Sequence, residues 1–200
     1  MIELENDISL DLEHPLGIQE GHGCKAFEGI FKGNNHSIKD ISMNTQSSTL
    51  FRSAGLFCEI RNATIRDLII DKSCSFKGSW SGALSCRVSG SLTLINVQNY
   101  GSVIGKEITG GFIGCGENIQ GATLSFVNCI NNATIEKTES QQYGCGGFIG
   151  SIANSQIEVS FRNCINNGTI QGTHILGGFI GMMENNNHLK VFFESTTNQG

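Results

Sequence analysis

The sequence predicts an all-β protein that folds as a right-handed parallel β-helix of about six coils, with three short strands per coil. The pentapeptide Gly-Gly-Phe-Ile-Gly occurs three times, at Gly110–Gly114, Gly146–Gly150 and Gly177–Gly181. Weaker forms of this phrase lie at Ala54–Phe57 and Ser81–Leu84, and the anchoring glycines are 27, 29, 36 and 31 residues apart. A phrase that recurs about every 30 residues is typical of a repeat architecture, and no segment has a helical period.

The composition agrees with this prediction and excludes some functions. The 200 residues include 26 Gly and one Pro, and 16% are charged, below the roughly 25% that is usual for soluble domains. The net charge is −5 and the 13 basic residues are scattered singly, so we expect no nucleic-acid partner. No apolar run approaches the roughly 18 residues that span a bilayer, so we expect no direct membrane insertion.

Each coil is predicted to contain three strands separated by turns rich in Asn, Gly and Ser. In one coil these strands are Gly146–Ser151, Gln156–Cys164 and Gly168–Gln171. Equivalent residues of successive coils then stack about 4.8 Å apart. We expect residues 1–26 to form an entry strand and loop, and residues 27–200 to form coils that start near 27, 54, 81, 110, 146 and 177.

Aligning the repeats reveals a column of Asn and Asp residues. These residues tolerate the left-handed backbone of a bend, and stacked amides can hydrogen-bond from coil to coil. The residue after each is expected to point inward, in a column of Ile41, Leu68, Val97, Cys129, Cys164 and Thr196. The predicted ladder consists of Asp40, Asp67, Asn96, Asn128 and Asn163.

The repeats resemble those of proteins that carry the GLUG motif, which occur on bacterial and protist surfaces. Residues Phe27–Ile38 are similar to the family's phrase F-x-G-x-F-x-G-N-x-x-x-I, and Asn6–Leu10 to its N-D-I-x-L strand. Gly-Gly-Phe-Ile-Gly is similar to the motif itself, with Phe in place of Leu. The resemblance runs from Ile8 to the end of the chain. It implies a β-helical scaffold that forms stalks or adhesive surfaces, which favours binding over catalysis.

The two ends of the sequence lead to expectations about a parent protein. Phe193–Gly200 parallels Phe161–Gly168, whose coil continues with Thr169–Gln171. We therefore expect a parent chain that continues past Gly200, although a native chain with a frayed last coil is the alternative. Met1–Asp7 lacks the features of a secretion signal. A cell-surface or extracellular location through a longer parent is the interpretation, and an intracellular location stays open.

The eight cysteines fall into three groups. Cys74, Cys129 and Cys164 occupy inward columns and are expected to be small buried hydrophobic residues. Cys86 and Cys115 each follow an anchoring glycine by four residues, so a disulfide between stacked coils is possible. No spacing fits zinc, and no metal site or cofactor is expected. The cysteines that fit no column are Cys24, Cys58 and Cys145.

Four N-x-Ser/Thr sequons leave two interpretations open. Each can carry a glycan in an exported protein, which would make it a glycoprotein. Each also precedes an inward apolar residue at a place that requires a turn, which Asn favours on its own account. The candidate asparagines are Asn35, Asn62, Asn132 and Asn167.

We expect a non-catalytic segment of a larger cell-surface or secreted protein, which serves structural display and adhesion. Insertions are where solenoids usually bind partners, and the longest one here lies between Glu136 and Gly144. Lys137, Glu139 and Tyr143 are its candidate binding residues. The expected partner is a protein or glycan on a host or neighbouring cell.

The alternative is a carbohydrate-active β-helix, such as a polysaccharide lyase or a glycoside hydrolase. Such an enzyme needs paired carboxylates or an acidic calcium site with a basic residue nearby. The acidic candidates are Asp40, Asp67 and Asp71, beside Arg66 and Lys39. Asp40 and Asp67 are expected to stack one coil apart, but later coils carry Asn there, which favours a structural role.

Overall fold

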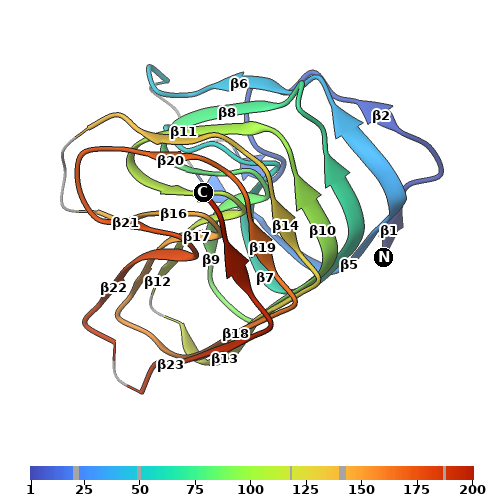
Figure 1. Ribbon diagram of the computed structural model, residues 1–200. Coiled ribbons are helices and arrows are strands. Elements are labelled where there is room, and N and C mark those ends of the chain that lie inside the picture. Colours follow the sequence, from blue (N-terminus) through green and yellow to red (C-terminus); the bar gives the residue numbers. More distant parts are fainter. Residues whose placement is uncertain (20–22, 49–50, 118, 140–142, 187) are drawn as a thin grey trace.

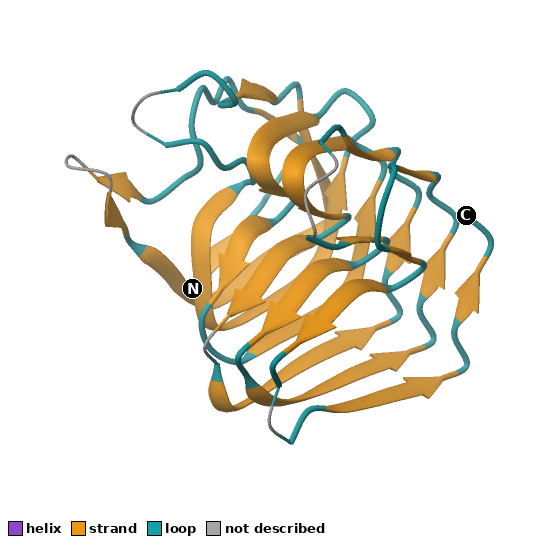
Figure 2. Ribbon diagram, turned by 90° about the vertical axis from the view of Figure 1, so that its left-hand side faces the viewer, coloured by secondary structure: helices purple, strands orange, loops and turns teal. Residues whose placement is uncertain are grey.

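The computed structural model describes residues 1–19, 23–48, 51–117, 119–139, 143–186 and 188–200. Over these residues the chain contains strands and turns without a helix, and the strands wind into six stacked coils (Figure 1 and Figure 2). The predicted parallel β-helix is confirmed. The same ranges contain no helix long and apolar enough to cross a membrane.

The strands follow the coils in chain order. The N-terminal strands are β1 (Ile2–Glu3), β2 (Ile8–Ser9), β3 (Ile18–Gln19) and β4 (Gly23–Cys24). The first two coils contain β5 (Ala26–Lys39), β6 (Ser42–Asn44), β7 (Phe57–Ile70) and β8 (Ser75–Gly82). The third coil contains β9 (Ser85–Val88), β10 (Leu92–Asn99) and β11 (Ser102–Gly110).

The later coils contain more, shorter strands. The fourth has β12 (Ile113–Glu117), β13 (Gln120–Val127), β14 (Ile130–Asn131), β15 (Ile135–Lys137) and β16 (Cys145–Gly146). The fifth has β17 (Ile149–Ala153), β18 (Gln156–Arg162), β19 (Ile165–Asn166), β20 (Ile170–Gln171) and β21 (Leu176–Gly177). The sixth has β22 (Ile180–Glu184), β23 (Lys190–Glu194) and β24 (Thr197–Asn198).

Two sheets enclose the core, and the coils pair in parallel. The larger sheet runs β22-β17-β12-β9-β7-β10-β13-β18-β23, and the smaller one runs β20-β15-β11-β16-β21. Strand β7 pairs with β9 through its first residues and with β10 through its last, so it passes round a corner without a break. The number of strands per coil therefore varies around the predicted three.

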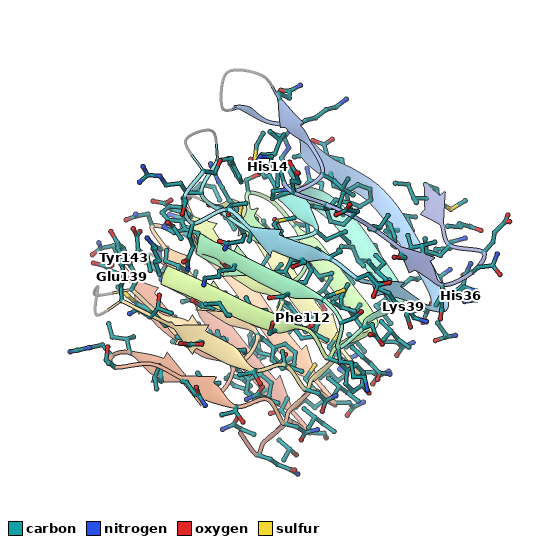
Figure 3. The ribbon with its side chains drawn as sticks, turned by 90° about the horizontal axis from the view of Figure 1, so that it is seen from above. His14, His36, Lys39, Phe112, Glu139 and Tyr143 are labelled. Atoms are coloured by element: carbon teal, nitrogen blue, oxygen red, sulfur yellow. A yellow bond between two sulfur atoms is a disulfide. The ribbon has the colours of Figure 1, made fainter. Side chains whose placement is uncertain are left out.

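The Gly-Gly-Phe-Ile-Gly phrase forms a corner, and the expectation that it begins a strand is wrong. In its first copy Gly110 ends β11 and Ile113 begins β12, while the ring of Phe112 between them is fully buried (Figure 3). The phenylalanines of the phrase form a column: the rings of Phe112 and Phe148 are tilted with centroids 4.9 Å apart, and those of Phe148 and Phe179 are stacked with centroids 4.8 Å apart. Edge-to-face contacts join this column to the rings of Phe126, Phe161 and Phe193. The repeats therefore build a continuous aromatic core.

A buried asparagine ladder lies behind these corners. Its members are in register in successive coils and are fully buried up to Asn166. Asn131 Nδ2 donates to Asn166 Oδ1 at 2.7 Å, and Asn166 Nδ2 donates to Asn198 Oδ1 at 2.7 Å. At the top of the ladder, Asn99 Nδ2 donates to the carbonyl of Gly111 at 2.7 Å. The sequence alignment missed this ladder.

The first coil has a different register from the predicted one. Lys32 lies opposite Arg66 but His36 lies opposite Leu68, so a bulge of three residues faces Asp67 alone. The predicted stacking of Asp40 on Asp67 is therefore wrong. Asp40 lies at the next corner, where its backbone N–H donates to Ser73 Oγ at 2.9 Å. Ile41 is still buried, as predicted, but it neighbours the start of β8 and lies outside the column of Leu68.

Candidate functional site

Four of the predicted ladder residues form a hydrogen-bonded column on the surface. Asn96 Nδ2 donates to Asp67 Oδ1 at 2.8 Å, Asn128 Nδ2 to Asn96 Oδ1 at 3.1 Å, and Asn163 Nδ2 to Asn128 Oδ1 at 3.2 Å. All four have φ between 51° and 53°, in the left-handed region. This conformation turns the chain at the corner, and Asn and Asp tolerate it best after Gly. The column thus has a structural task.

Two of the three acidic candidates share a corner, since the backbone N–H of Asp40 and the carboxylate of Asp71 both bond to Ser73, and both carboxylates act electrostatically on Lys39. Asp67 lies in the ladder, with Arg66 Nη1 3.5 Å from its carboxylate. Asp40 accepts a hydrogen bond from Ser9 Oγ at 2.7 Å, and Asp71 accepts one from the backbone N–H of Ser73 at 2.9 Å. The backbone and hydroxyl donors of Ser73 lower the pKa of Asp71. A general acid needs the opposite shift.

Lys39, the basic candidate, is held by a neighbour from the N-terminal segment. Its Nζ lies 2.7 Å from Asp7 Oδ2, and His36 Nδ1 lies 3.5 Å from Asp7 Oδ1. The hydrogen bond to Asp7 raises the pKa of Lys39, so the amine stays charged. His36 and Lys39 lie at one side of the solenoid, opposite the side where Glu139 and Tyr143 lie (Figure 3).

The predicted binding insertion presents only part of its candidate set to solvent. Lys137 is 3% exposed, its ammonium donates to the carbonyl of Tyr143, and burial lowers its pKa. Lys137 therefore does not offer its charge to a partner, and it lies outside the exposed binding surface. Glu139 lies 3.7 Å from Lys106 Nζ, and Tyr143 is 40% exposed. Residues 140–142 of the insertion lie outside the described residues.

The next coil adds two apolar side chains to this corner. Leu176 is in register with Cys145, which places Ile175 and Leu176 one coil below the end of the insertion. Ile175 is 40% exposed and Leu176 is 47% exposed. Ile175 also has φ of 51°, which is unusual for a β-branched residue. We call Tyr143, Ile175 and Leu176 the apolar corner. Cys145 and Leu176 are 31 residues apart, which is the repeat length between Gly147 and Gly178. This spacing was the sequence signal that could have placed Ile175 and Leu176 beside the insertion.

Two of the sequon asparagines have left-handed backbone within long strands, and the other two lie between strands. Asn35 and Asn62 are exposed with φ of 62° and 50°. Asn167 Nδ2 donates to Asn132 Oδ1 at 2.9 Å, so these two stack as neighbours in adjacent coils. Asn132 is half-buried and Asn167 is exposed. Left-handed backbone and an exposed side chain therefore occur together at Asn35 and Asn62.

The cysteines pair differently from the expected possibility. Cys24 and Cys58 form a disulfide with their Cα atoms 5.9 Å apart, although neither fits a sequence column. It ties the hairpin of β3 and β4 to β7. Cys86 and Cys115 are free buried thiols, and burial raises the pKa of each to about 12. Cys74, Cys129 and Cys164 are buried as predicted. The disulfide was missed because Cys24 lies outside the repeats.

In the described parts of the chain, no group of three or more His, Cys, Asp or Glu side chains gathers in a way that could hold a metal ion. The described surface offers the apolar corner, further exposed apolar side chains in the last coil (Met183, Phe192 and Phe193), and carboxylates that accept hydrogen bonds at turns. Comparisons with protein-family models, curated proteins and solved structures found no match, so the fold and the candidate site rest on this chain's own residues.

Proposed function

We propose that this chain is a non-catalytic β-helical segment of a larger cell-surface or secreted protein, and that it serves structural display and adhesion. The observation that carries the proposal is the apolar corner of Tyr143, Ile175 and Leu176. Clustered exposed apolar side chains mark interaction sites more often than isolated ones do. The corner sits on a hydrogen-bonded stack of coils, and a preformed surface loses little conformational entropy on binding.

The backbone at Ile175 supports a functional role for this corner. A left-handed backbone at a β-branched residue is strained by about 1–3 kcal/mol. Asn occupies most of the other left-handed positions, including Asn96 and Asn128, where the left-handed backbone costs less. An apolar side chain kept at an exposed and strained position is explained by contact with a partner.

Two further observations support the proposed location. The Cys24–Cys58 disulfide is of the kind that persists in oxidising compartments. The resemblance to GLUG-motif proteins favours the surface of a cell. The partner we propose is a protein or glycan on a host or neighbouring cell, contacted through the apolar corner with Glu139 at its rim.

Adhesion is tested with the purified protein coupled to beads and presented to cultured cells and to a glycan array. We expect the double variant Tyr143→Ser/Leu176→Ser to reduce bead binding at least about tenfold, which corresponds to about 1.4 kcal/mol. Tyr100→Ser is the matched control, since Tyr100 is 42% exposed and lies in a different turn. Both variants should keep the thermal midpoint of the parent. Equal binding by the double variant and the control would remove the apolar corner as the adhesive surface.

The non-catalytic part of the proposal needs its own assay. The protein is incubated with a panel of acidic and neutral polysaccharides, and unsaturated or reducing ends are measured. We expect no release above a heat-denatured sample. Release that disappears in Asp40→Asn/Asp71→Asn would replace the proposal with the carbohydrate-active alternative.

A further inference from the structure

A separate cavity lies on the outer side of β7 and β9, beside the Cys24–Cys58 disulfide. Its volume is about 360 Å³, within the range of small-molecule sites. Two aromatic side chains line it, Phe51 and Trp80, together with the charged side chains of Glu59 and Arg87. Three larger cavities, of about 540, 540 and 570 Å³, lie elsewhere among the described residues, and each of these three lacks a second aromatic ring.

The aromatic wall of this cavity is held in place. Trp80 Nε1 donates to Glu107 Oε2 at 2.9 Å, and the backbone carbonyl of Trp80 accepts from Ala54 N at 2.9 Å. The first hydrogen bond holds the N–H edge of the indole, and the second holds the main chain of Trp80. A fixed and half-exposed aromatic face is suited to packing against the C–H face of a sugar ring.

The charged rim provides a free cation. Arg87 is exposed, and Glu59 is its register partner across adjacent strands. No ion pair joins the two, and the guanidinium of Arg87 has no hydrogen-bonding partner in the described structure. The carboxylate of Glu59 instead accepts the hydroxyl of Ser89. A guanidinium binds a carboxylate through two parallel hydrogen bonds, which makes an organic acid the natural ligand for Arg87.

We propose that this cavity binds a sugar unit that carries a carboxylate. The ring of the sugar packs on Trp80, the carboxylate pairs with Arg87, and Glu59 accepts hydrogen bonds from sugar hydroxyls. The inference goes beyond the proposed function, because it assigns a second surface and a ligand class. Binding of a soluble sugar to this cavity is measured without an adhesion assay. Either proposal can therefore be contradicted while the other one holds.

The chain offers a direct readout, because Trp80 is its single tryptophan. Fluorescence is followed while galacturonic acid, its short oligomers and neutral galactose are added, and the affinities are checked by calorimetry. We expect a saturable change with the acidic sugars and at least about tenfold weaker binding of galactose. This ratio follows from the loss of one charge-assisted hydrogen-bonded pair.

Variants separate the two halves of the site. Arg87→Gln should weaken galacturonate binding about tenfold and leave galactose binding unchanged. Arg162→Gln, an exposed arginine of β18 paired with Glu194, is the matched control and should change neither. Trp80→Leu, followed by calorimetry, should weaken both sugars. Arg87 is exposed, so its variant tests the proposal even if Trp80→Leu does not fold.

Three outcomes would overturn the proposal. They are the absence of saturable binding by any acidic sugar, equal affinities of Arg87→Gln and the parent for galacturonate, and an equal fluorescence response to inorganic phosphate alone. The last outcome would mean that Arg87 attracts any anion and that no sugar is recognised.

Discussion

The side-chain amide of Asn131 donates a 2.7 Å hydrogen bond to Asn166 Oδ1, and both residues are fully buried. Asn131 Oδ1 also accepts from the backbone N–H of Ala133 at 3.4 Å. A buried amide is stabilising only when its donors and acceptors are paired. The buried ladder meets this condition by repeating the same residue in the same place from coil to coil.

Asn131→Ala is expected to destabilise the fold by about 2–3 kcal/mol, since it leaves buried polar groups of Asn166 and Ala133 unpaired. The matched control is Asn167→Ala, which removes a similar amide hydrogen bond on the exposed surface and should cost less than about 1 kcal/mol. Both values come from urea unfolding curves. Equal losses in the two variants would show that burial of the ladder contributes nothing.

Gly147→Ala is expected to destabilise by about 3 kcal/mol, because a Cβ there would lie 2.6 Å from Asn166 Cγ and would also strike the carbonyl of Gly178. The obstruction includes backbone, which cannot move aside. Gly116→Ala is the control, since its nearest neighbour is the end of the Ile119 side chain at 3.3 Å, and its change should stay below about 1 kcal/mol. The thermal midpoints of both variants are compared with the parent, and a fully stable Gly147→Ala would contradict the packing described for this corner.

Asn96 separates turn geometry from hydrogen bonding in the surface ladder. Its φ of 53° costs an ordinary L-residue about 1–2 kcal/mol, whereas Gly adopts it freely. We therefore expect Asn96→Ala to lose about 2 kcal/mol and Asn96→Gly about half of that. Urea unfolding of the two variants gives the comparison. If Gly is as harmful as Ala, the amide contacts to Asp67 and Asn128 outweigh the turn.

The buried thiols predict how stability depends on pH. Burial raises the pKa values of Cys86, Cys115 and Cys145 to about 12, against 9.0 for an exposed thiol. From about pH 9 to 12 the unfolded chain loses protons that the folded chain keeps, so the free energy of unfolding falls as pH rises. Below pH 9 the thiols are protonated in both the folded and the unfolded chain, so they do not make the free energy of unfolding depend on pH.

The measurement is urea unfolding between pH 8 and about 10.5, with Cys115→Ala as the comparison. The variant has one fewer thiol with a raised pKa, so its free energy of unfolding should fall less steeply as the pH rises across this range. A slope identical to that of the parent would show that Cys115 ionises as readily in the folded chain as in the unfolded one.

Much of the repeat could be read from the sequence, and the errors have local physical causes. The Asn residues of the surface ladder could be recognised in the sequence because each one turns the chain at the same position of its coil. Asp40 was misplaced because three residues of β5 bulge opposite Asp67, and a bulge leaves no periodic signal. Asn99, Asn131 and Asn166 were missed because a polar residue in a column beside apolar ones looks like a loop residue.

The candidate sites depended more on the fold. Tyr143 was visible as part of an insertion, but its neighbours Ile175 and Leu176 come from the next coil. Lys137 looked like a surface charge, and only the folded corner shows that its ammonium turns inward to the carbonyl of Tyr143. The cavity of Trp80 and Arg87 could not be foreseen, since its residues come from separate strands and loops.

The sequence by itself determined the parallel β-helix and its coil length, because a solenoid uses the same local solution in every coil and repetition makes that solution visible. Only the tertiary structure decided the register of the first coil, the Cys24–Cys58 pairing, the buried asparagine ladder and the direction of Lys137. Each of these depends on contacts between coils about 30 residues apart, or on a segment outside the repeats. Such contacts are set by packing in three dimensions, which a one-dimensional pattern does not contain.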